Sequence, residues 1–500
     1  MEVKLNKDSI SYYSKVLCIE FSQEETAENI VPDTLPDIAT VIDADAMAIL
    51  RGKDISDGRL TVNGMIFGYI LYRSEDEELR RMPVQLPFSA HWDNSSITQN
   101  CKSTVKLTVS SFEGRIINSR KLLLRAEVAV SAEIFHMVNC EYTSGAECEQ
   151  LELLKDNISF THVCAVGERT FAISEELQLP AGKPQIESVL KYRVKLWCNE
   201  VKAVGSRLVV KGSAVLCVIY KSADGGGICN AEFSLPFSQI YDTDCSDDIV
   251  AADAALMLTG IYLDVNDTMG EPVGSIKVEI GAVAQFCAWS ESQINCLCDA
   301  YSTQNEVSMT LGSSKLNESK NSAARDEFIS LTVSTQPPAK GIADVYTYLG
   351  KQRMENGACV WPLSAKVIYE GDGGKILSAS GSVEVRTAIE AGARAAAEIG
   401  EISGKVIAGG IELRIPVKYS IVIEDEIGFA TPEELSVDEE CIKDISRQPS
   451  IVVIKTDGCT SLWSMAKQFN TTISTIKEAN PDICGSIPEK GELLLIAKKR

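Results

Sequence analysis

An internal repeat constrains the fold of this chain more than any other feature of its sequence. When the chain is shifted by 148 residues, prolines, glycines and apolar residues of its first part fall on the same residue types further along. The matched pairs are Pro32 and Pro180, Pro36 and Pro184, Ile38 and Ile186, Val41 and Val189, Gly64 and Gly212, and Tyr72 and Tyr220. One residue later in register, Leu86-Pro87-Phe88 matches Leu235-Pro236-Phe237. Chance does not maintain one register over so long a stretch, so the pattern predicts a duplicated structural unit.

A third, degraded copy of the unit is visible around Tyr369, where Val367-Ile368-Tyr369 repeats the apolar stretches that end at Tyr72 and Tyr220. A polar turn follows each of the three tyrosines. The turns lie at residues 74–77, 223–226 and 371–374. Gly and Asp supply the positive φ values that tight hairpins require. We therefore expect the tyrosines to have a structural role beside hairpin turns; a repeated contact surface is the alternative.

The clearest strands are predicted late in each copy, where apolar residues occupy every second position. These residues are Leu122, Leu124, Ala126, Val128, Val130, Ala132 and Ile134 in the first copy, Ile276, Val278, Ile280, Ala282, Ala284 and Phe286 in the second, and Ile411, Leu413, Ile415, Val417, Tyr419, Ile421 and Ile423 in the third. Such alternation indicates a strand with one face on a core and the other in water. Pro416 falls in the outward set of the third copy, which favours an edge strand.

The fold class expected is therefore mainly β: tandem, repeated antiparallel β-sandwich or open-barrel modules, followed by a small α+β (βααβ) domain. Five units are expected: β repeat 1 at 1–150, β repeat 2 at 151–303, a degraded β repeat 3 at 304–435, a polar linker at 436–449 and a C-terminal domain at 450–500. Within the third unit, the Ala-rich stretch 388–399 predicts one short helix.

The charge balance excludes some classes of partner. The chain carries a formal net charge of −22, whereas proteins that bind nucleic acids need a basic surface to displace counterions from phosphates. Anionic membranes are disfavoured for the same reason. No apolar run approaches the length of a membrane-spanning helix, so we expect no integral membrane segment.

The 16 cysteines do not predict a disulfide framework. No secretory signal follows Met1, and several cysteines lie inside apolar, strand-like runs, where a thiol behaves as a small hydrophobic group. Examples are Cys18, Cys198, Cys217 and Cys287. We therefore expect a cytosolic chain with reduced cysteines.

Motifs for catalysis, metals and cofactors are lacking. The sequence contains no GxSxG elbow and no HExxH arrangement, and it has three histidines. Gly371 to Lys375 lacks the spacing of a phosphate-binding loop, and Cys296 and Cys298 have no second ligand pair at zinc-site spacing. We expect a non-enzymatic protein with no catalytic residue, no metal and no cofactor.

The last fifty residues follow a different pattern. A short apolar strand at 451–454 precedes helical spacing at 461–469, with Leu462, Met465, Ala466 and Phe469 on one face. A second helical stripe follows Asn470-Thr471-Thr472 and ends at Asn480-Pro481. A final strand is expected at 492–496, which gives the order strand, helix, helix, strand.

This segment resembles the LysM family. The resemblance is carried by Leu462-Trp463-Ser464-Met465-Ala466, Asn470-Thr471-Thr472, Ile476, Asn480-Pro481, and Ile487-Pro488 through Gly491. LysM domains bind N-acetylglucosamine-containing glycans in a shallow groove between two loops. The groove that the resemblance implies, for a protein or a glycan partner, is lined by Gly458, Cys459, Thr460, Ser461, Leu462, Ile476, Asn480, Pro481, Asp482 and Ile483. Family members usually read Gly-Asp-Thr/Ser-Leu before the tryptophan. This chain is one residue longer there and lacks the acid, which disfavours glycan binding. Trp463 is expected in the domain core rather than stacked on a ligand.

Three features together resemble the SPOCS-domain family of spore coat morphogenetic proteins of clostridia, the SipL type. They are the segment 32–38, the repeated tyrosine hairpin and the terminal LysM-like segment. The resemblance implies a scaffold in spore coat and envelope assembly. Such a protein works in the mother-cell cytosol, is recruited to the forespore surface and docks through its LysM domain to the coat-basement ATPase. Self-association through edge strands is a further expectation. The alternative is a wall protein that binds peptidoglycan or chitin-type glycans.

Overall fold

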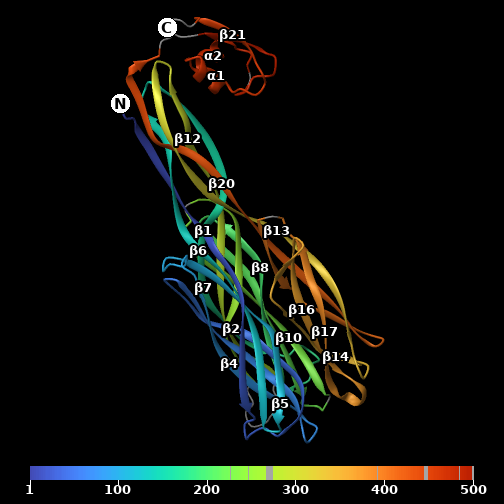
Figure 1. Cartoon of the computed structure of the whole chain (residues 1–500). Helices are drawn as coiled ribbons and strands as arrows, with labels where there is room; N and C mark the ends of the chain where they lie inside the picture. The colour runs from blue at the N-terminus through green and yellow to red at the C-terminus, as the bar shows by residue number, and fades with distance from the viewer. Residues whose placement is uncertain are drawn as a thin grey trace.

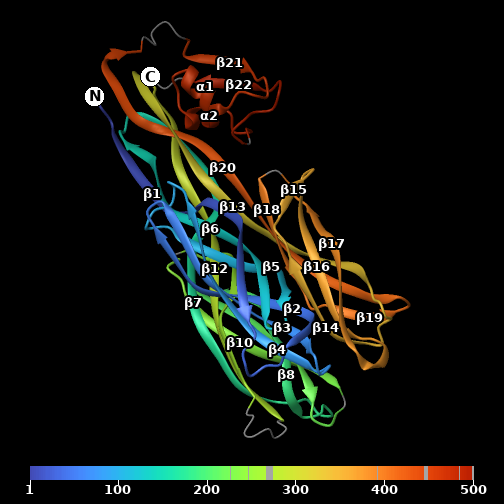
Figure 2. The ribbon, with the colours of Figure 1, turned by 60° about the horizontal axis from the view of Figure 1, so that its bottom comes forward.

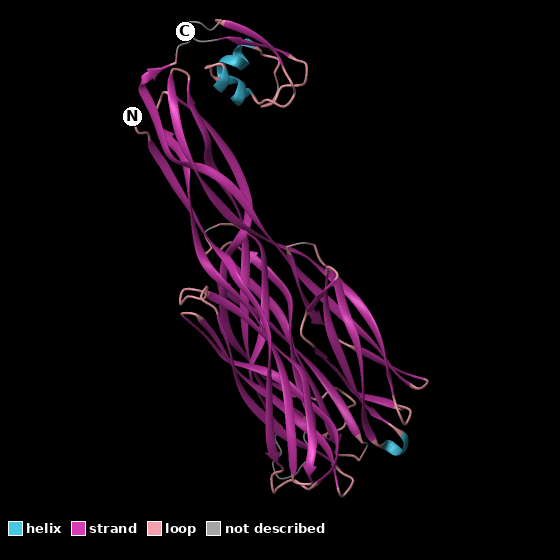
Figure 3. Ribbon diagram, viewed as in Figure 1, coloured by secondary structure: helices cyan, strands magenta, loops and turns pink. Residues whose placement is uncertain are grey.

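The computed structural model describes residues 1–225, 227–245, 247–265, 274–390, 392–443, 449–483 and 485–497, with residues 321–324 described by their backbone alone. Strands dominate, as predicted, and the helices among the described residues are short (Figure 3). The first block contains β1 (Lys4–Ile30), β2 (Ile38–Ser56), β3 (Arg59–Ser74), β4 (Leu79–Asp93), β5 (Lys102–Asn118) and β6 (Lys121–Glu147). The second block contains β7 (Leu151–Gln178), β8 (Ile186–Val204), β9 (Arg207–Ser222), β10 (Ile228–Asp242), β11 (Ile249–Asp264) and β12 (Ser275–Ser302).

The third block and the C-terminal domain complete the chain. The third block contains β13 (Asn305–Ser334), β14 (Gly341–Leu349), β15 (Arg353–Glu355), β16 (Ala358–Glu370), the 3-10 turn η1 (Asp372–Gly374), β17 (Ile376–Ala388), β18 (Ala393–Ile399), β19 (Ser403–Ile407) and β20 (Gly410–Ile442). The C-terminal domain contains β21 (Ile451–Lys455), α1 (Leu462–Gln468), α2 (Ile473–Ala479) and β22 (Leu493–Ala497).

Strand pairing follows one scheme in all three blocks. The first strand of each block pairs with the last: β1 with β6, β7 with β12 and β13 with β20. A small antiparallel sheet forms separately in each block, with orders β2-β3-β4, β10-β9-β8 and β14-β16-β15, where β17 also pairs with β16. In the first block, the apolar faces of the two sheets enclose one core. The third block lies beside the other two (Figure 2).

The alternating apolar positions build these cores as predicted. The alternating set of β6 from Leu122 to Ile134 is buried throughout, and the sets of β12 and β20 are buried in the same way from Ile276 to Phe286 and from Ile411 to Ile421. Burial of each Val, Leu, Ile or Phe side chain among them contributes about 1.5–3 kcal/mol. One face of each long strand therefore holds its block together.

The three repeated tyrosines have the structural role that was predicted. Tyr72, Tyr220 and Tyr369 are all buried. Their hydroxyls donate to backbone carbonyls that precede the small sheets: Tyr72 to Pro36 (3.0 Å), Tyr220 to Pro184 (3.0 Å) and Tyr369 to Gln336 (3.2 Å). Each tyrosine thus fixes the entry of the chain into its small sheet.

Beyond the sandwiches, the paired strands β1·β6, β7·β12 and β13·β20 continue as three ribbons that wind around one another into a stalk (Figure 1). Tyr12, Phe160 and Leu316, one from each first strand, are buried in the stalk core. The rings of Tyr12 and Phe160 meet edge to face at 5.5 Å. The C-terminal domain sits at the far end of the stalk, near the N-terminus (Figure 1).

Three sequence-based expectations are wrong. Residues 393–399 form strand β18 and not a helix, because Ala393, Ala395 and Ala397 alternate with more exposed residues in register with β20. Residues 436–442, expected in the linker, continue β20; residues 444–448 of that linker lie outside the described part of the chain. Pro416 lies in β20, which pairs with β13 on one side and with β18 and β19 on the other, so the strand is central. The proline is accommodated where β18 ends and before β19 begins.

A buried histidine in the stalk makes stability depend on pH. His162 lies against the rings of Tyr12 and Phe160, and its Nε2 faces the hydroxyl of Ser290 at 3.2 Å. Burial lowers the pKa of His162, although the charge of Asp247 opposes this. The unfolded chain therefore binds the proton more tightly than the folded one, and stability falls as pH drops below about 6.5.

Replacing His162 with Phe should remove this pH dependence. For each pH unit below 6.5, we expect the free energy of unfolding of the wild type to fall by up to about 1.4 kcal/mol relative to that of His162→Phe. Thermal unfolding at pH 7.5, 6.5 and 5.5 measures the effect, with His91→Phe at an exposed position as the control. Parallel profiles for the wild type and His162→Phe would contradict this account.

Candidate functional site

The C-terminal domain begins from local sequence signals that fix its two helices. Ser461 caps α1 by accepting a hydrogen bond from the backbone N–H of Ser464, and Thr472 caps α2 in the same way from Thr475. The strands β21 and β22 pair antiparallel. Apolar side chains from both helices and both strands meet in one small core. The domain is therefore a compact unit in the order β21, α1, α2, β22.

Only part of the predicted groove is available to a ligand. Leu462 and Ile476 are fully buried in the domain core, and Ile483 packs against the same core. Cys459, Pro481 and Asp482 are exposed. The remaining positions are partly buried, and they are Gly458, Thr460, Ser461, Asn480 and Ile483. The two loops of the groove are brought near each other, because the backbone N–H of Leu462 donates to the carbonyl of Ser486 at 2.8 Å.

The first loop is held rigid by Asp457. Its carboxylate accepts hydrogen bonds from the backbone N–H groups of Cys459 (2.7 Å) and Thr460 (2.8 Å) and from the Thr460 hydroxyl (2.7 Å). These bonds lower the pKa of Asp457 to about 2. Gly458 has a positive φ of 77°, and a Cβ there would lie 2.8 Å from the Cβ of Lys490. The loop thus requires glycine both for its backbone conformation and for space.

Asn480 has a structural task. Its side-chain N–H groups donate to the carbonyls of Ile476 (2.7 Å) and Leu495 (2.6 Å), and its Oδ1 accepts from the backbone N–H of Leu495 (2.8 Å). The amide therefore pairs with the edge of β22 as a neighbouring strand would. These bonds leave the Asn480 side chain committed to the fold rather than to a ligand.

The C-terminal domain is attached to the tip of the stalk through α1 and the loop that follows it. Asp299 of β12 accepts a hydrogen bond from the indole N–H of Trp463 at 2.8 Å and forms an ion pair with Lys467 at 2.7 Å. Tyr301, also in β12, donates its hydroxyl to the carbonyl of Thr471 at 2.7 Å, and its ring meets that of Trp463 edge to face at 4.8 Å. Trp463 is buried, as predicted, but at an interface with the stalk as well as in its own core.

The sequence did not point to Asp299 or Tyr301 as contact residues. Both follow the alternating part of β12, and nothing in their spacing identifies the segment they contact. Lys443 adds a further link, since its ammonium donates to the carbonyl of Ser302 (3.0 Å) and to the side chain of Asn470 (3.1 Å). The domain therefore has a defined orientation on the stalk.

A second cluster of interacting side chains, which are buried and charged, lies where the three small sheets meet. One position is equivalent in the three small sheets, and it holds Asp43 of β2, Lys191 of β8 and Asp344 of β14. In each sheet, this residue pairs with the residue that immediately precedes the repeated tyrosine on the neighbouring strand. Lys191 is 2% exposed. Its Nζ lies 3.0 Å from Asp45 and 3.6 Å from Asp43, and it forms an ion pair with Asp344.

We call these residues, together with Asp45, Arg193, Tyr346 and Tyr348, the axial cluster. Its next layer again brings together equivalent positions of the three blocks. Asp45 and Tyr346 stand at equivalent positions beside Arg193, and Arg193 forms an ion pair with Asp45. The hydroxyl of Tyr346 donates to Asp43 at 2.6 Å, and that of Tyr348 donates to Asp45 at 2.7 Å. Residues from all three blocks thus form one buried hydrogen-bonded network.

The protonation states of the axial cluster are fixed by these contacts. Burial disfavours the charged form of Asp45, but the charges of Arg193 and Lys191 and the hydrogen bond from Tyr348 outweigh it and lower the pKa of Asp45. Burial likewise opposes the charge on Lys191, and the carboxylates of Asp344, Asp45 and Asp43 raise its pKa above the ordinary value. The pKa shifts of Asp45 and Lys191 therefore both favour the charged form at neutral pH.

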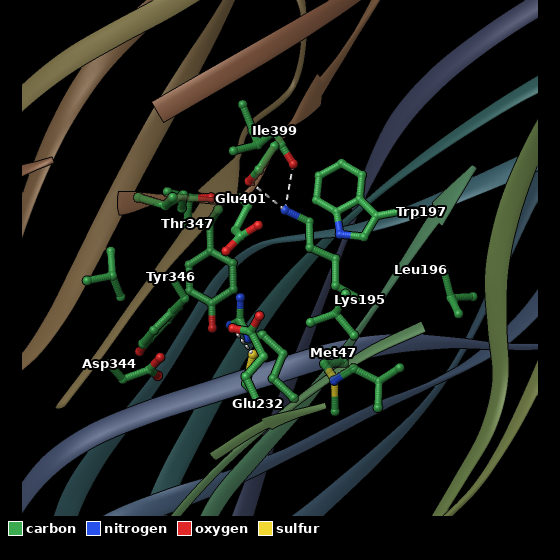
Figure 4. A pocket seen from close by; sticks show the side chains of 18 of the residues that line it. Met47, Lys195, Leu196, Trp197, Glu232, Asp344, Tyr346, Thr347, Ile399 and Glu401 are labelled. Atoms are coloured by element: carbon green, nitrogen blue, oxygen red, sulfur yellow. Dashed lines mark hydrogen bonds between the residues drawn. The ribbon is translucent and has the colours of Figure 1, made fainter. Parts of the chain in front are cut away.

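A groove of about 720 Å³ adjoins the axial cluster (Figure 4). It is lined by β8 of the second block and β14 of the third, together with residues 46–48 of β2 and 106–109 of β5 from the first block. We call it the β8–β14 groove, after the strands that form its walls. Lys195 projects into it beside Trp197, with its Nζ 4.2 Å from the indole ring. Burial and the charge of Arg193 lower the pKa of Lys195 to about 8.

Lys195 replaces a hydrogen bond that Pro416 cannot make. The backbone N–H of Gly400 donates to the carbonyl of Pro416 at 2.7 Å, but Pro416 has no N–H to return to Gly400. Instead, the ammonium of Lys195 donates to the carbonyls of Gly400 (3.1 Å) and Ile399 (2.5 Å). A side chain of the second block thereby donates hydrogen bonds to backbone carbonyls at the edge of the third block.

Metal and membrane sites are not indicated by the part of the chain that the structure describes. Within it, no three or more His, Cys, Asp and Glu side chains gather in a way that could hold a metal ion. Nor does any described helix have the length and apolar character needed to span a membrane.

Comparison with known proteins assigns the second block. Residues 185–280, which run from β8 into β12, match the SipL family, SPOCS domain. The chain carries a SPOCS domain of the SipL family. Neither a curated protein nor a solved structure matches the chain. The match supports the resemblance inferred from the sequence and implies a spore coat morphogenetic protein. The SPOCS domain contains Lys191 and Arg193, which are the cations of the axial cluster, and Lys195, which projects into the groove.

Proposed function

We propose that this protein is a non-enzymatic scaffold in spore coat assembly, and that its C-terminal domain docks it to the coat-basement ATPase on the forespore surface. The SPOCS domain of the SipL family carries this proposal. On this reading the protein works in the mother-cell cytosol and the C-terminal domain is of the LysM type. The fold is consistent with a scaffold role, because three blocks share one buried charge network and one stalk core.

The arrangement of the C-terminal domain suits a docking role. It lies at the end of an elongated stalk (Figure 1), and the side chains of Asp299 and Tyr301 fix its orientation there. Cys459, Pro481 and Asp482 of the predicted groove remain exposed. The acid among them and the commitment of Asn480 to β22 favour a protein partner over the alternative, a peptidoglycan or chitin-type glycan.

Two variants test the docking function. Deletion of residues 449–500 and the double substitution Cys459→Glu with Asp482→Lys should each abolish co-purification of the ATPase from sporulating cells and recruitment to the forespore surface. The double variant changes exposed side chains, so it retains the fold. Glu75→Lys, an exposed acid-to-lysine change in the β3–β4 turn of the first block, is the matched control and should behave as the wild type.

A glycan pull-down decides between the two classes of partner. If the full chain is retained on purified peptidoglycan, and the Cys459→Glu, Asp482→Lys variant is not, the glycan-binding alternative is correct. Unchanged ATPase binding by the deletion variant would show that another part of the molecule makes the contact.

A further inference from the structure

The first two blocks differ at a place where the repeat predicts the same packing. Strands β1 and β7 keep the shift of 148 residues in the structure, because the pairing of each strand is interrupted at equivalent residues, Val16 in β1 and Cys164 in β7. The same shift places Gly167 on Ile19. Ile19 is buried in the core of the first block. The second block therefore lacks a large apolar side chain that the first block buries there.

An aromatic pair of the first block is replaced beside this glycine. The rings of Phe21 and Trp92 stack at 5.8 Å. Phe21 corresponds to Arg169 by the shift of 148 residues. Trp92 corresponds to Tyr241, because each directly precedes the aspartate of an equivalent arginine–aspartate ion pair. The second block therefore presents a guanidinium and a phenol where the first block packs two rings against each other.

A pocket of about 270 Å³ lies at this place in the second block, and we call it the Tyr241 pocket. Phe286 of β12 forms part of its wall, and its ring stacks on that of Tyr241 at 5.6 Å. The arrangement requires Gly167, since a Cβ there would lie 2.5 Å from the Cζ of Phe286. The first block contributes Tyr13 of β1 and Lys102 of β5 to the lining. The pocket therefore lies where the two blocks meet.

One residue of the pocket carries a hydrogen-bond donor that lacks an acceptor. Tyr241 is 2% exposed, and its hydroxyl is buried without a hydrogen-bond partner among the described residues. Burial raises the pKa of Tyr241 to about 12, although the charge of Arg169 opposes this. The phenol therefore keeps its proton at neutral pH. Because a buried donor is unfavourable when it is left unpaired, an acceptor atom of a ligand would satisfy it.

Two cationic side chains line the pocket, Lys102 and Arg169. Neither forms an ion pair within the part of the chain that the structure describes. The ammonium of Lys102 lies over the ring of Tyr13 at 4.9 Å. Arg169 donates a hydrogen bond to the carbonyl of Ile240 at 3.4 Å. Both charges are therefore available to an anion in the pocket.

Three acidic residues also line the pocket, and two of them already have a cationic partner. Glu168 pairs with Lys53 at 2.8 Å, and Asp242 pairs with Arg207 at 2.8 Å. Asp244 is the third, and it has no ion pair among the described residues. Two available cations against one unpaired acid favour a ligand with a single negative charge.

We propose that the Tyr241 pocket binds a small monocarboxylate with an apolar body. The hydroxyl of Tyr241 donates to a carboxylate oxygen, and Arg169 and Lys102 supply the opposite charge. The rings of Phe286 and Tyr13 pack on the apolar body. Because drug-sized molecules occupy pockets of about 300–1,000 Å³, a pocket of this size suits a smaller ligand. The site lies in the body of the protein and is independent of the docking function proposed for the C-terminal domain.

Benzoate, benzamide and benzamidine are suitable probes, because they have nearly the same shape and carry a negative charge, no charge and a positive charge at neutral pH. Saturation-transfer NMR titrations with the full chain measure their affinities. Benzoate should show saturable binding. Benzamide should bind at least roughly tenfold more weakly, because a hydrogen bond to a charged group contributes more than one to a neutral group. Benzamidine should not bind.

Variants of the full chain locate the binding. Tyr241→Phe and Arg169→Gln should each weaken benzoate binding at least roughly tenfold. Tyr241→Phe removes the unpaired hydroxyl and keeps the ring, so the unfolding temperature of the chain without ligand should not fall. Arg115→Gln, at an exposed position of β5 outside the pocket, is the matched control for charge. This variant and the deletion of residues 449–500 should bind benzoate as the wild type does.

Three results would overturn the proposal. Absence of saturable benzoate binding to the wild type would show that the pocket holds solvent only. Equal affinity for benzoate and benzamidine would show that the pocket does not select a negative charge. Undiminished benzoate binding by both Tyr241→Phe and Arg169→Gln would place the bound molecule elsewhere on the chain.

Discussion

Replacing Lys191 with Met is expected to destabilise the body of the protein by about 3–5 kcal/mol, because removal of one member of a buried ionic network leaves the others uncompensated. Lys191 Nζ is surrounded by Asp43, Asp45 and Asp344, one carboxylate from the third block and two from the first. Methionine fills a similar volume but cannot neutralise these charges. Thermal or urea-induced unfolding of the full chain measures the loss.

The same substitution at the surface is the matched control. Lys221 forms an ion pair with Glu187 at 2.9 Å, and both side chains are well exposed, so Lys221→Met should cost at most about 1 kcal/mol. If both variants lose equal stability, the axial cluster does not hold the blocks together.

The pH dependence of the same variant adds a second readout. The lowered pKa of Asp45 means that its contribution to stability is present above the unfolded pKa of about 3.9 and is lost as pH falls below it. In Lys191→Met the carboxylates lose a cation and become easier to protonate. The stability deficit of the variant should therefore shrink as the pH is lowered toward 4, whereas the Lys221→Met difference should stay constant.

Replacing Tyr301 with Ala is expected to release the C-terminal domain from the stalk. Loss of a buried aromatic side chain costs about 3–5 kcal/mol, and Tyr301 is buried with its ring against Trp463. Small-angle X-ray scattering should show a larger radius of gyration, and limited proteolysis should separate the domain from the remaining blocks. The sandwiches should keep the wild-type unfolding temperature.

Tyr301→Phe is the control for this experiment. It removes the hydrogen bond to Thr471 but retains the ring, so it should cost only about 1 kcal/mol and leave the domain attached. If Tyr301→Ala scatters as the wild type does, the orientation of the domain is set elsewhere, for example by Lys443 and Asn470.

Local patterns predicted much of this fold. The alternation in β6, β12 and β20 identified the strands and their buried faces. A strand with one face on a core and the other in water must alternate apolar and polar residues. The tyrosine hairpins were predicted correctly for a similar reason, since a turn requires particular residues. The Ala-rich stretch of β18 was misassigned because alanine favours helices, although the larger residues Arg394 and Glu398 mark its exposed face.

The contacts between blocks could not be predicted in this way, because they depend on how distant segments meet. One signal for them was present. The shift of 148 residues places Asp43 on Lys191 and Asp45 on Arg193. The repeat preserves apolar residues elsewhere, but at these two positions the acidic residue of the first copy corresponds to a basic residue of the second. Opposite charges at equivalent positions indicate that the copies face one another. For Asp299, Tyr301 and the groove beside Lys195, the sequence offered no comparable signal.

The blocks share a pairing scheme, yet the axial cluster is built from Asp43, Lys191 and Asp344, which are not identical. A ring of three identical chains would present every binding surface three times. Joining three unlike copies in one polypeptide instead leaves one terminal domain on each molecule. Under the proposed docking function, each molecule therefore offers one docking site, and the expected ratio of the protein to its partner is one to one.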